Sequence, residues 1–274
     1  MCDSESCNES IPPQELPHVS RQQRREFLKG LASLPLAVVL ADPALAQAAG
    51  KSLTRVAHKT SNAIDINAYV ALPKQTPAPC VLLVHEWWGL NDQIKSVAAE
   101  FANQGYVALA VDLYQGKVAT SRADAKAYMQ STDRTLATQT LTAWIQWLRQ
   151  HPHSSSKVGT IGWCFGGGWS LNASLATAVD ATVIYYGNVR KSAEDLKSLK
   201  GPVLGHFATL DTFINSQMVS GFETAMHKAG KHKPQVYWYT ARHAFANPSS
   251  ARYDEADAKL AWSRTLEFFK THLS

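Results

Sequence analysis

Short apolar runs alternate with longer amphipathic stretches along most of this chain. Residues 52–60 and 63–72 favour an antiparallel hairpin at a sheet edge, and later strand-like runs are separated by helix-compatible segments. Residues 121–150 carry apolar positions at helical spacing, including Leu141 and Ile145. Because strands alternating with helices form right-handed crossovers, the pattern predicts a mostly parallel, doubly wound α/β sheet flanked by helices. The other expected strands are 80–84, 106–111, 157–161, 181–186, 202–208 and 235–240, and the other expected helices begin near Asn91, follow residue 164, and span 216–229 and 252–272.

Length and composition agree with a single folded domain after a separate amino-terminal segment. The chain has 274 residues, of which 45% are hydrophobic, enough to bury a substantial core. No internal repeat or interior linker divides residues 47–274, so we expect them to form one domain. The formal charge of +5 comes from scattered basic residues, with no arginine-rich block or nucleic-acid motif. We therefore expect a solvated surface and no nucleic-acid partner.

A glycine-rich heptapeptide, Gly-Trp-Cys-Phe-Gly-Gly-Gly at residues 162–168, lies between a strand-like run and a helix-compatible run. This is the context of a nucleophile elbow, G-x-C-x-G, in which a strained strand-to-helix turn exposes the side chain of Cys164. Neighbouring glycines let the backbone turn sharply, and the N-terminus of the next helix favours negative charge at the sulfur and on an oxyanion. The alternative is that Cys164 is a buried small hydrophobe and that the glycines only permit close packing.

Two further polar residues, Asp211 and His243, each lie just beyond an expected parallel strand. This is the sheet edge where ligands bind in open α/β folds. The chain order nucleophile, acid, base is that of an α/β-hydrolase. We therefore predict a triad in which His243 accepts the proton of the Cys164 thiol and Asp211 fixes the histidine tautomer. Taken singly, Asp211 could cap the helix expected near Asn215, and His243 could be an ordinary loop histidine.

Glu86 follows another buried-strand run, at residues 81–84. It lies in the segment His-Glu-Trp-Trp-Gly at residues 85–89. A buried carboxylate without a partner is costly, so Glu86 is predicted to have one. The alternative is a surface glutamate beside two packed indoles.

Four segments resemble the dienelactone hydrolase family in order and spacing, and the resemblance extends over nearly everything from residue 51 to residue 274. It implies an α/β-hydrolase fold and a cysteine hydrolase that opens an enol-lactone or related ester through an acyl-enzyme. It also implies a small-molecule ester or lactone substrate, and no required cofactor or metal. The segments are His-Glu-Trp-Trp-Gly-Leu-Asn at 85–91, Val-Asp-Leu-Tyr at 111–114, Gly-Trp-Cys-Phe-Gly-Gly at 162–167 and His-Ala-Phe at 243–245.

The resemblance also implies roles for individual residues. Glu86 matches a glutamate that contacts the resting thiol and helps to generate the thiolate when substrate arrives. The backbone N–H groups of Trp87 and Phe165 match those of the oxyanion hole. These roles follow from the resemblance and not from the spacing of the residues.

Substrate contacts depart from the family pattern. Family members acting on carboxylated dienelactones hold the carboxylate with two arginines, one shortly after the Asp-Leu-Tyr motif and one four residues after the catalytic histidine. Here these places hold Gln-Gly-Lys, ending at Lys117, and Asn247. Lys117 is a flexible point charge rather than a bidentate fork, so we expect a preference for neutral lactones or esters. Trp88, Tyr114 and Trp163 are candidate pocket residues, with ordinary packing as the alternative.

Other functions use the same machinery or the same fold. A thioesterase or broad carboxylesterase is the nearest alternative to a lactone hydrolase. A non-catalytic binding protein could keep the fold and the pocket, but the complete set of Cys164, Asp211 and His243 favours an enzyme.

Residues 1–46 resemble a twin-arginine export signal. Arg24 and Arg25 precede an apolar stretch at residues 30–41, and Ala-Leu-Ala at 44–46 supplies a small-x-small cleavage pattern. The alternative is an uncleaved anchor, but about a dozen apolar residues interrupted by a proline are short of the roughly 20 that span a bilayer. We therefore expect cleavage near residue 46, an export receptor as partner of the precursor, no stable membrane anchoring, and a periplasmic or otherwise exported product.

Cleavage would leave two of the four cysteines, Cys80 and Cys164. Cys80 opens an expected buried strand and is interpreted as a core thiol. A disulfide between the two would block the proposed nucleophile. An exported enzyme of this kind would expose its reactive thiol to oxidising surroundings.

Overall fold

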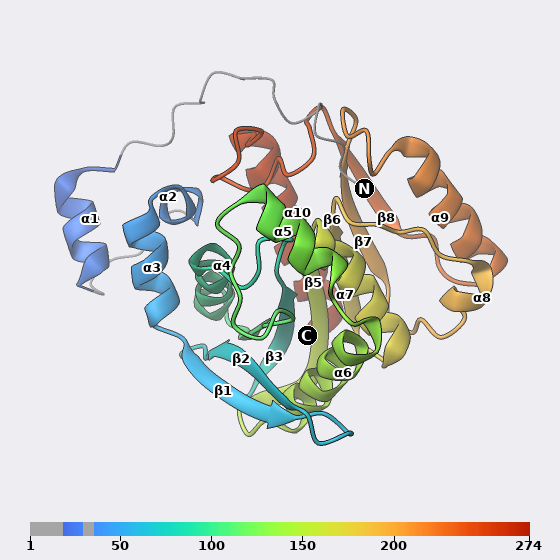
Figure 1. Ribbon diagram of the computed structural model, residues 1–274, viewed down its shortest axis with the longest axis horizontal. Coiled ribbons are helices and arrows are strands. Elements are labelled where there is room, and N and C mark those ends of the chain that lie inside the picture. The colour runs from blue at the N-terminus through green and yellow to red at the C-terminus, as the bar shows by residue number, and fades with distance from the viewer. Residues whose placement is uncertain (1–18, 30–35) are drawn as a thin grey trace.

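An eight-stranded sheet forms the centre of the computed structural model, which describes residues 19–29 and 36–274 (Figure 1). The strands are β1 (Thr54–Lys59), β2 (Asp65–Ala71), β3 (Ala78–Val84), β4 (Val107–Val111), β5 (Ser154–Trp163), β6 (Ala181–Tyr185), β7 (Val203–Ala208) and β8 (Gln235–Tyr239). Their order is β1-β2-β4-β3-β5-β6-β7-β8. β2 pairs antiparallel with β1 and β4, and all the other pairs are parallel. The predicted mostly parallel sheet with an antiparallel hairpin at one edge is confirmed.

Helices cover both faces of this sheet and bury it between two layers (Figure 1). One face packs against α4 (Asp92–Asn103) and α10 (Glu255–Leu273). The other face packs against α6 (Arg134–Gln150), α7 (Phe165–Ala176) and α9 (Ser216–Lys228). The remaining helices are α1 (Arg21–Leu28), α2 (Leu36–Ala41), α3 (Pro43–Lys51), α5 (Arg122–Gln130) and α8 (Ala193–Leu196).

The central strand β3 shows why its sequence is a continuous apolar run. Val81 and Leu83 face the α4/α10 layer, and Leu82 and Val84 face the α6/α7 layer. All four are fully buried, because neighbouring strands and both helical layers surround them. Cys80, at the start of the run, is a buried free thiol, as predicted, and burial raises its pKa to about 11.

The helical region expected over residues 121–150 is helical but interrupted, because the structure has two helices there, α5 and α6. The polar run Ser-Thr-Asp at 131–133 separates them. Asp133 caps α6, since its carboxylate accepts hydrogen bonds from the N–H groups of Thr135 (2.8 Å) and Leu136 (3.0 Å). Apolar spacing continues through the break and therefore did not reveal it.

The described part of the amino-terminal segment packs against the sheet domain. Leu45 and Ala46 of α3 are buried, and the carbonyl of Ala46 accepts a hydrogen bond from the Ser96 hydroxyl of α4 (2.9 Å). Arg24 of α1 forms an ion pair of 2.5 Å with Asp42, which caps α3. Half of the expected apolar signal stretch, residues 30–35, lies outside the described residues, as do residues 1–18. In the part that is described, no helix is long and apolar enough to cross a membrane.

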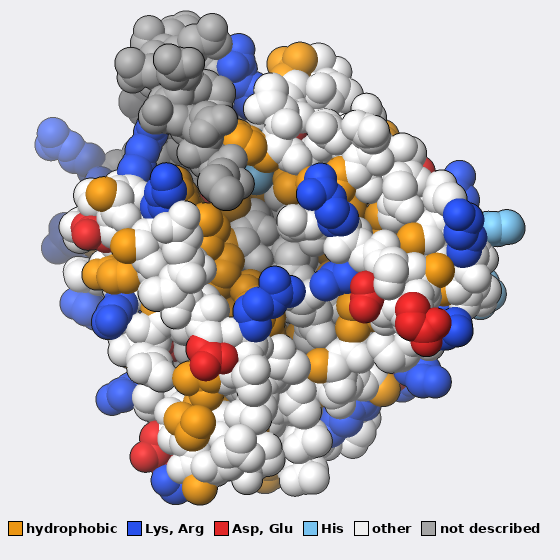
Figure 2. Space-filling view, turned by 45° about the vertical axis from the view of Figure 1, so that its right-hand side comes forward, with side chains coloured by type: hydrophobic (Ala, Val, Ile, Leu, Met, Phe, Trp, Pro, Cys, Tyr) orange, Lys and Arg blue, Asp and Glu red, His pale blue; other side chains and the backbone are white. Residues whose placement is uncertain are grey.

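Basic side chains are spread over the face shown in Figure 2, with acidic side chains among them. No continuous basic stripe is visible on that face. This distribution agrees with the scattered lysines and arginines of the sequence and its modest net charge of +5.

Candidate active site

The turn at Cys164 has the strained backbone of a nucleophile elbow. β5 ends at Trp163, α7 begins at Phe165, and Cys164 between them has φ 54° and ψ −115°. A positive φ is unfavourable for a residue with a side chain and persists only where the surroundings enforce it. The backbone N–H of Cys164 donates to the carbonyl of Tyr185 at 3.0 Å, which ties the turn to β6.

Two glycines allow the elbow to pack closely. A Cβ at Gly162 would lie 2.0 Å from the carbonyl oxygen of Gly166, and a Cβ at Gly166 would lie 2.2 Å from that of Val84. The first turn of α7 therefore rests directly on the backbone of β5 and β3. This contact fixes Cys164 at the carboxyl edge of the sheet.

The structure brings His243 and Asp211 together. Their chain positions follow β8 and β7, and His243 Nδ1 lies 2.6 Å from Asp211 Oδ2. The other oxygen of Asp211 accepts hydrogen bonds from the N–H groups of Phe213 (2.9 Å) and Ile214 (3.1 Å). Burial raises the pKa of Asp211, but His243 and these donors outweigh burial and hold it below its usual value. Asp211 is therefore a buried carboxylate that orients His243, while Asn215 caps α9.

His243 presents its second nitrogen to the nucleophile side of the site. Nε2 is buried and has no hydrogen-bond partner among the described residues. His243 and Cys164 line the same two cavities. Burial lowers the pKa of His243, but its interactions with the side chains of Cys164 and Asp211 raise it well above its usual value. The arrangement suits a histidine that accepts a proton from the thiol and carries it as an imidazolium.

Glu86 is buried beside these residues and has the partners that its burial requires. Its Oε2 accepts a hydrogen bond from Asn247 Nδ2 (2.5 Å), and its Oε1 accepts one from the Tyr186 hydroxyl (3.4 Å). Burial raises its pKa, whereas His243, Asn247 and Tyr186 oppose that shift. The contact with the resting Cys164 thiol, which the resemblance implies, is not among the hydrogen bonds of Glu86 in the described residues.

The two backbone N–H groups that the resemblance assigns to an oxyanion hole lie in the segment after β3 and at the start of α7. Trp87 directly follows Glu86, and Phe165 is the first residue of α7. Cys164 caps α7 without a side-chain hydrogen bond, so the first N–H groups of the helix are not capped by it. Trp88 packs edge-on against Trp87, with ring centroids 5.1 Å apart, and both indoles line a cavity that contains Cys164.

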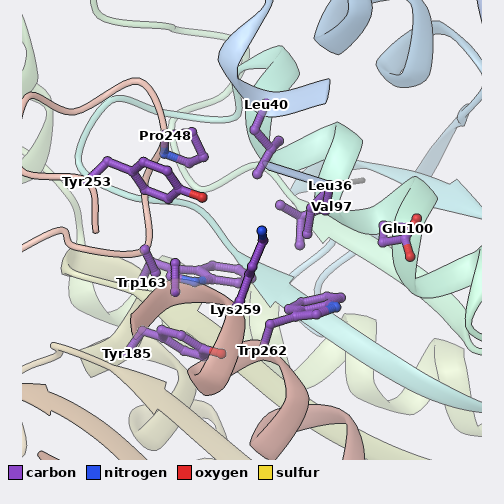
Figure 3. A pocket seen from close by; sticks show the side chains of 12 residues that line it. Leu36, Leu40, Val97, Glu100, Trp163, Tyr185, Pro248, Tyr253, Lys259 and Trp262 are labelled. Carbon is purple, nitrogen blue, oxygen red and sulfur yellow. The ribbon is translucent and has the colours of Figure 1, made fainter. Parts of the chain in front are cut away.

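Three of the candidate substrate contacts are not in the two cavities at Cys164. Tyr114 and Lys117 line a separate cavity of about 520 Å³, where Lys117 lies over the ring of Tyr128. The side chain of Trp163 points into the α4/α10 layer, because consecutive strand residues point to opposite faces of the sheet. Figure 3 shows it with Tyr185 and Trp262 in an apolar cavity of about 240 Å³. Only Tyr114 remains near the elbow, with its ring centroid 5.5 Å from that of Phe165.

Asn247 is near the site but is occupied by other protein groups. Its Oδ1 accepts hydrogen bonds from Gln93 Nε2 (2.7 Å) and from the N–H (2.9 Å) and hydroxyl (2.6 Å) of Ser249. Its Nδ2 donates to Glu86. Asn247 therefore orients Glu86, and it also lines the smaller cavity at Cys164.

Several residues that line the two cavities at Cys164 were not predicted from the sequence. The smaller cavity, about 310 Å³, is also lined by Arg122, Met129, Phe213 and Arg252, and the larger, about 570 Å³, by Arg134, Arg190 and Lys191. Most belong to loops or helices rather than to strand ends, so the rule that located the triad could not find them. No group of three or more histidines, cysteines or carboxylates in the described residues could hold a metal ion.

The comparisons with known proteins agree with this geometry. The sequence model of the dienelactone hydrolase family matches residues 66–273. The chain belongs to the dienelactone hydrolase family. It is 31% identical over 216 residues to a carboxymethylenebutenolidase of Pseudomonas putida, covering 73% of this chain and 89% of that one. It is also 31% identical over 223 residues to the protein usf of Aquifex pyrophilus, covering 78% and 96%.

A solved structure gives the same result for the fold. A putative dienelactone hydrolase of Klebsiella pneumoniae superposes with a TM-score of 0.70 at 25% identity, covering 79% of this chain and 99% of that one. The family member described here is thus an α/β-hydrolase-like enzyme that acts on ester or lactone bonds.

Proposed function

We propose that this enzyme hydrolyses a small-molecule lactone or enol ester through a covalent acyl-enzyme on Cys164. The observation that carries the proposal is the alignment of three groups. Asp211 holds His243 by Nδ1, the opposite nitrogen of His243 is buried, and the side chain of Cys164, which stands on a strained elbow, interacts with His243 in the same cavities.

In the first half of the reaction, His243 takes the proton of Cys164 and the thiolate attacks the carbonyl carbon. The tetrahedral oxyanion would be stabilised by the N–H groups of Trp87 and Phe165, the latter at the positive end of α7. Collapse breaks the ester bond, and the imidazolium of His243 returns its proton to the leaving oxygen. Asp211 stabilises the imidazolium throughout.

In the second half, His243 removes a proton from water, which attacks the thioester. The second tetrahedral intermediate expels Cys164 as a thiolate, which takes back the proton from His243, and the carboxylic acid product leaves. In the proposal Glu86 contributes charge beside His243 and the thiol. Its anchoring by Asn247 and Tyr186 keeps that charge in a fixed place.

The test is the paired replacement of the two free cysteines of the described chain. We expect Cys164→Ala to abolish hydrolysis of activated esters, because it removes the attacking atom, while Cys80→Ala retains activity as the matched control. Intact-mass measurement during turnover should show one acyl group on the wild type and none on Cys164→Ala. Hydrolysis by pure Cys164→Ala protein above a few per cent of the wild-type rate would contradict the proposal.

We also propose that the enzyme is made as a precursor and exported by a twin-arginine route. The support is the sequence of residues 1–46, with Arg24 and Arg25 before an apolar stretch and a small-x-small pattern. Both arginines belong to α1, on the outside of the folded domain.

A further inference from the structure

The larger cavity at Cys164 has one wall made of cations. Arg134, Arg190 and Lys191, called here the basic wall, line it together with Cys164 and His243. Arg134 is the first residue of α6, and the other two lie on the loop between β6 and α8. Segments more than fifty residues apart in the chain thus bring three positive charges to one cavity of about 570 Å³.

In the described residues, no carboxylate is bound directly to these cations, although Asp195 is near enough to Lys191 to act on its charge. In residues 19–29 and 36–274, none of the three cations forms an ion pair with a carboxylate. The adjacent acids serve as helix caps: Asp133 binds N–H groups of α6, and Asp195 binds the N–H and hydroxyl of Ser192.

The cations also act on one another. Burial lowers the pKa of Lys191, Asp195 opposes the shift, and Arg134 adds to it. The rest of the cavity presents aromatic surface, including Phe165, Trp169 and Phe213. Charges of one sign that form no ion pairs attract counter-charged ligands, more strongly beside low-dielectric walls. Arginine forks suit the planar or tetrahedral oxygens of carboxylates and phosphates.

The basic wall lies at other places in the chain than Lys117 and Asn247, which match the family's carboxylate-binding arginines. Lys117 lines another cavity, and Asn247 is bound to Glu86. The expectation of a neutral substrate rested on those two places alone. The structure supplies positive charge from α6 and from the loop after β6 instead.

We propose that the basic wall binds an anionic group of the substrate, a carboxylate or a phosphate that lies beyond the scissile ester bond. The inference rests on the proposed function, because it takes Cys164 as the attacking atom. The substrate class is then an ester or lactone whose acyl or leaving portion extends into the larger cavity and ends in negative charge.

The test compares matched esters at low ionic strength. p-Nitrophenyl valerate is neutral, the p-nitrophenyl monoester of glutaric acid carries a carboxylate on a chain of equal length, and the p-nitrophenyl ester of 4-phosphonobutyrate carries a phosphonate. Phenyl acetate and 4-carboxyphenyl acetate place the charge on the leaving group instead. The measured quantity is the ratio of kcat/KM for the anionic ester to that for its neutral match. This ratio does not depend on the fraction of folded protein, because unfolded enzyme lowers both kcat/KM values by the same factor.

We expect Arg190→Gln and Lys191→Gln, made together, to lower this ratio in at least one pair by about fivefold for each cation, as for exposed charge contacts. Arg134→Gln should lower it by a similar factor. Lys270→Gln, which removes an exposed charge of α10 away from both cavities, should leave the ratio unchanged. Added salt should lower the wild-type ratio and have less effect on the double variant. The carboxylate and phosphonate arms identify which anion is preferred.

Ratios that stay the same in all three pairs for every basic-wall variant would overturn the inference. The proposed function is judged separately on the same esters. If Cys164→Ala abolishes hydrolysis while the ratios stay flat, only the basic-wall assignment fails. If Cys164→Ala still hydrolyses them, the cysteine mechanism itself fails.

Discussion

At the scale of single residues, Asn247 shows how one amide can fix a buried carboxylate. Three donors bind its Oδ1, and this leaves Nδ2 directed at Glu86. Rotation of the amide by half a turn would break these bonds and leave a carbonyl oxygen facing a carboxylate oxygen. The orientation of Asn247 is therefore determined, and Glu86 has a donor in every state that keeps this arrangement.

Replacing this amide by a carboxylate tests the arrangement. Asn247→Asp keeps an acceptor for Gln93 and Ser249 but sets two carboxyl groups side by side, so the pair must share a proton in the folded state. The shared proton raises the pKa of this carboxyl pair in the folded state above its value in the unfolded chain. The variant should therefore be less stable than wild type at neutral pH. Since both groups titrate near pH 4 when unfolded, its deficit in Tm relative to wild type should shrink as pH falls from 8 towards 4.

Asn103→Asp is the matched control, because Asn103 also donates to a glutamate, Glu100, at 3.2 Å but is exposed. Its change in Tm should be small and nearly independent of pH. A pH-independent deficit for Asn247→Asp would mean that the Glu86 contact does not carry the effect.

The sequence could predict that Cys164, Asp211 and His243 lie together, because each follows a strand of a parallel sheet. Trp163 was named as a candidate pocket residue because of its place in the chain, but it lines another cavity. It is adjacent to Cys164 in the chain, yet strand geometry turns its side chain into the other layer. The basic wall was missed because nothing in the sequence shows that the start of α6 lies beside the loop after β6.

At the scale of elements, the contact between the elbow and β3 decides where Cys164 stands. Gly166 meets the carbonyl oxygens of Val84 and His85, which belong to backbone that cannot move aside cheaply. The elbow, β3 and the segment that carries Glu86 are therefore held as one unit.

A single methyl group should disrupt this unit. We expect Gly166→Ala to displace the start of α7, lowering kcat/KM by at least about a hundredfold, because small misplacements of reacting groups are that costly. It should also lower Tm, since overpacking costs about 1–3 kcal/mol. The comparison is Gly221→Ala within α9, where an added Cβ meets nothing within 4 Å. That variant should keep full activity and be as stable as wild type or slightly more stable. Equal activity of the two variants would show that the close contact is dispensable.

Most strands and helices were predictable from apolar spacing, and the break between α5 and α6 was not. The apolar positions of the two helices fall close to one continuous helical phase, while the break depends on Asp133 finding the N–H groups of α6. Capping outweighs periodicity at such points because it supplies partners for backbone groups that the helix leaves unpaired.

At the scale of the whole molecule, the amino-terminal segment and the sheet domain share an interface. Leu40 joins the core cluster beneath α4, and Ala46, the expected cleavage point, is buried in α3 and bound to Ser96. A protease needs an extended, accessible chain. Cleavage there therefore requires α3 to leave α4, which makes processing a step that follows local opening of the precursor.

The export proposal predicts a defect when the paired arginines are changed without loss of charge. Arg24→Lys with Arg25→Lys should leave uncleaved precursor inside the cell, because a translocation receptor reads the pair itself. Arg21→Lys, in the same helix, is the control and should be exported normally. Intact-mass analysis should place the amino terminus of the exported wild type near Gln47. An exported protein that still begins at Met1 would contradict cleavage.

The strand order places Cys164 and His243 after strands that differ in how well the sheet supports them. Cys164 follows β5, which has strands on both sides, whereas His243 follows β8, the outermost strand, paired only with β7. Edge strands open before central ones, because fewer contacts hold them. We expect local opening of β8 to displace His243 while β5 still holds Cys164, so that activity would be lost before the central sheet unfolds.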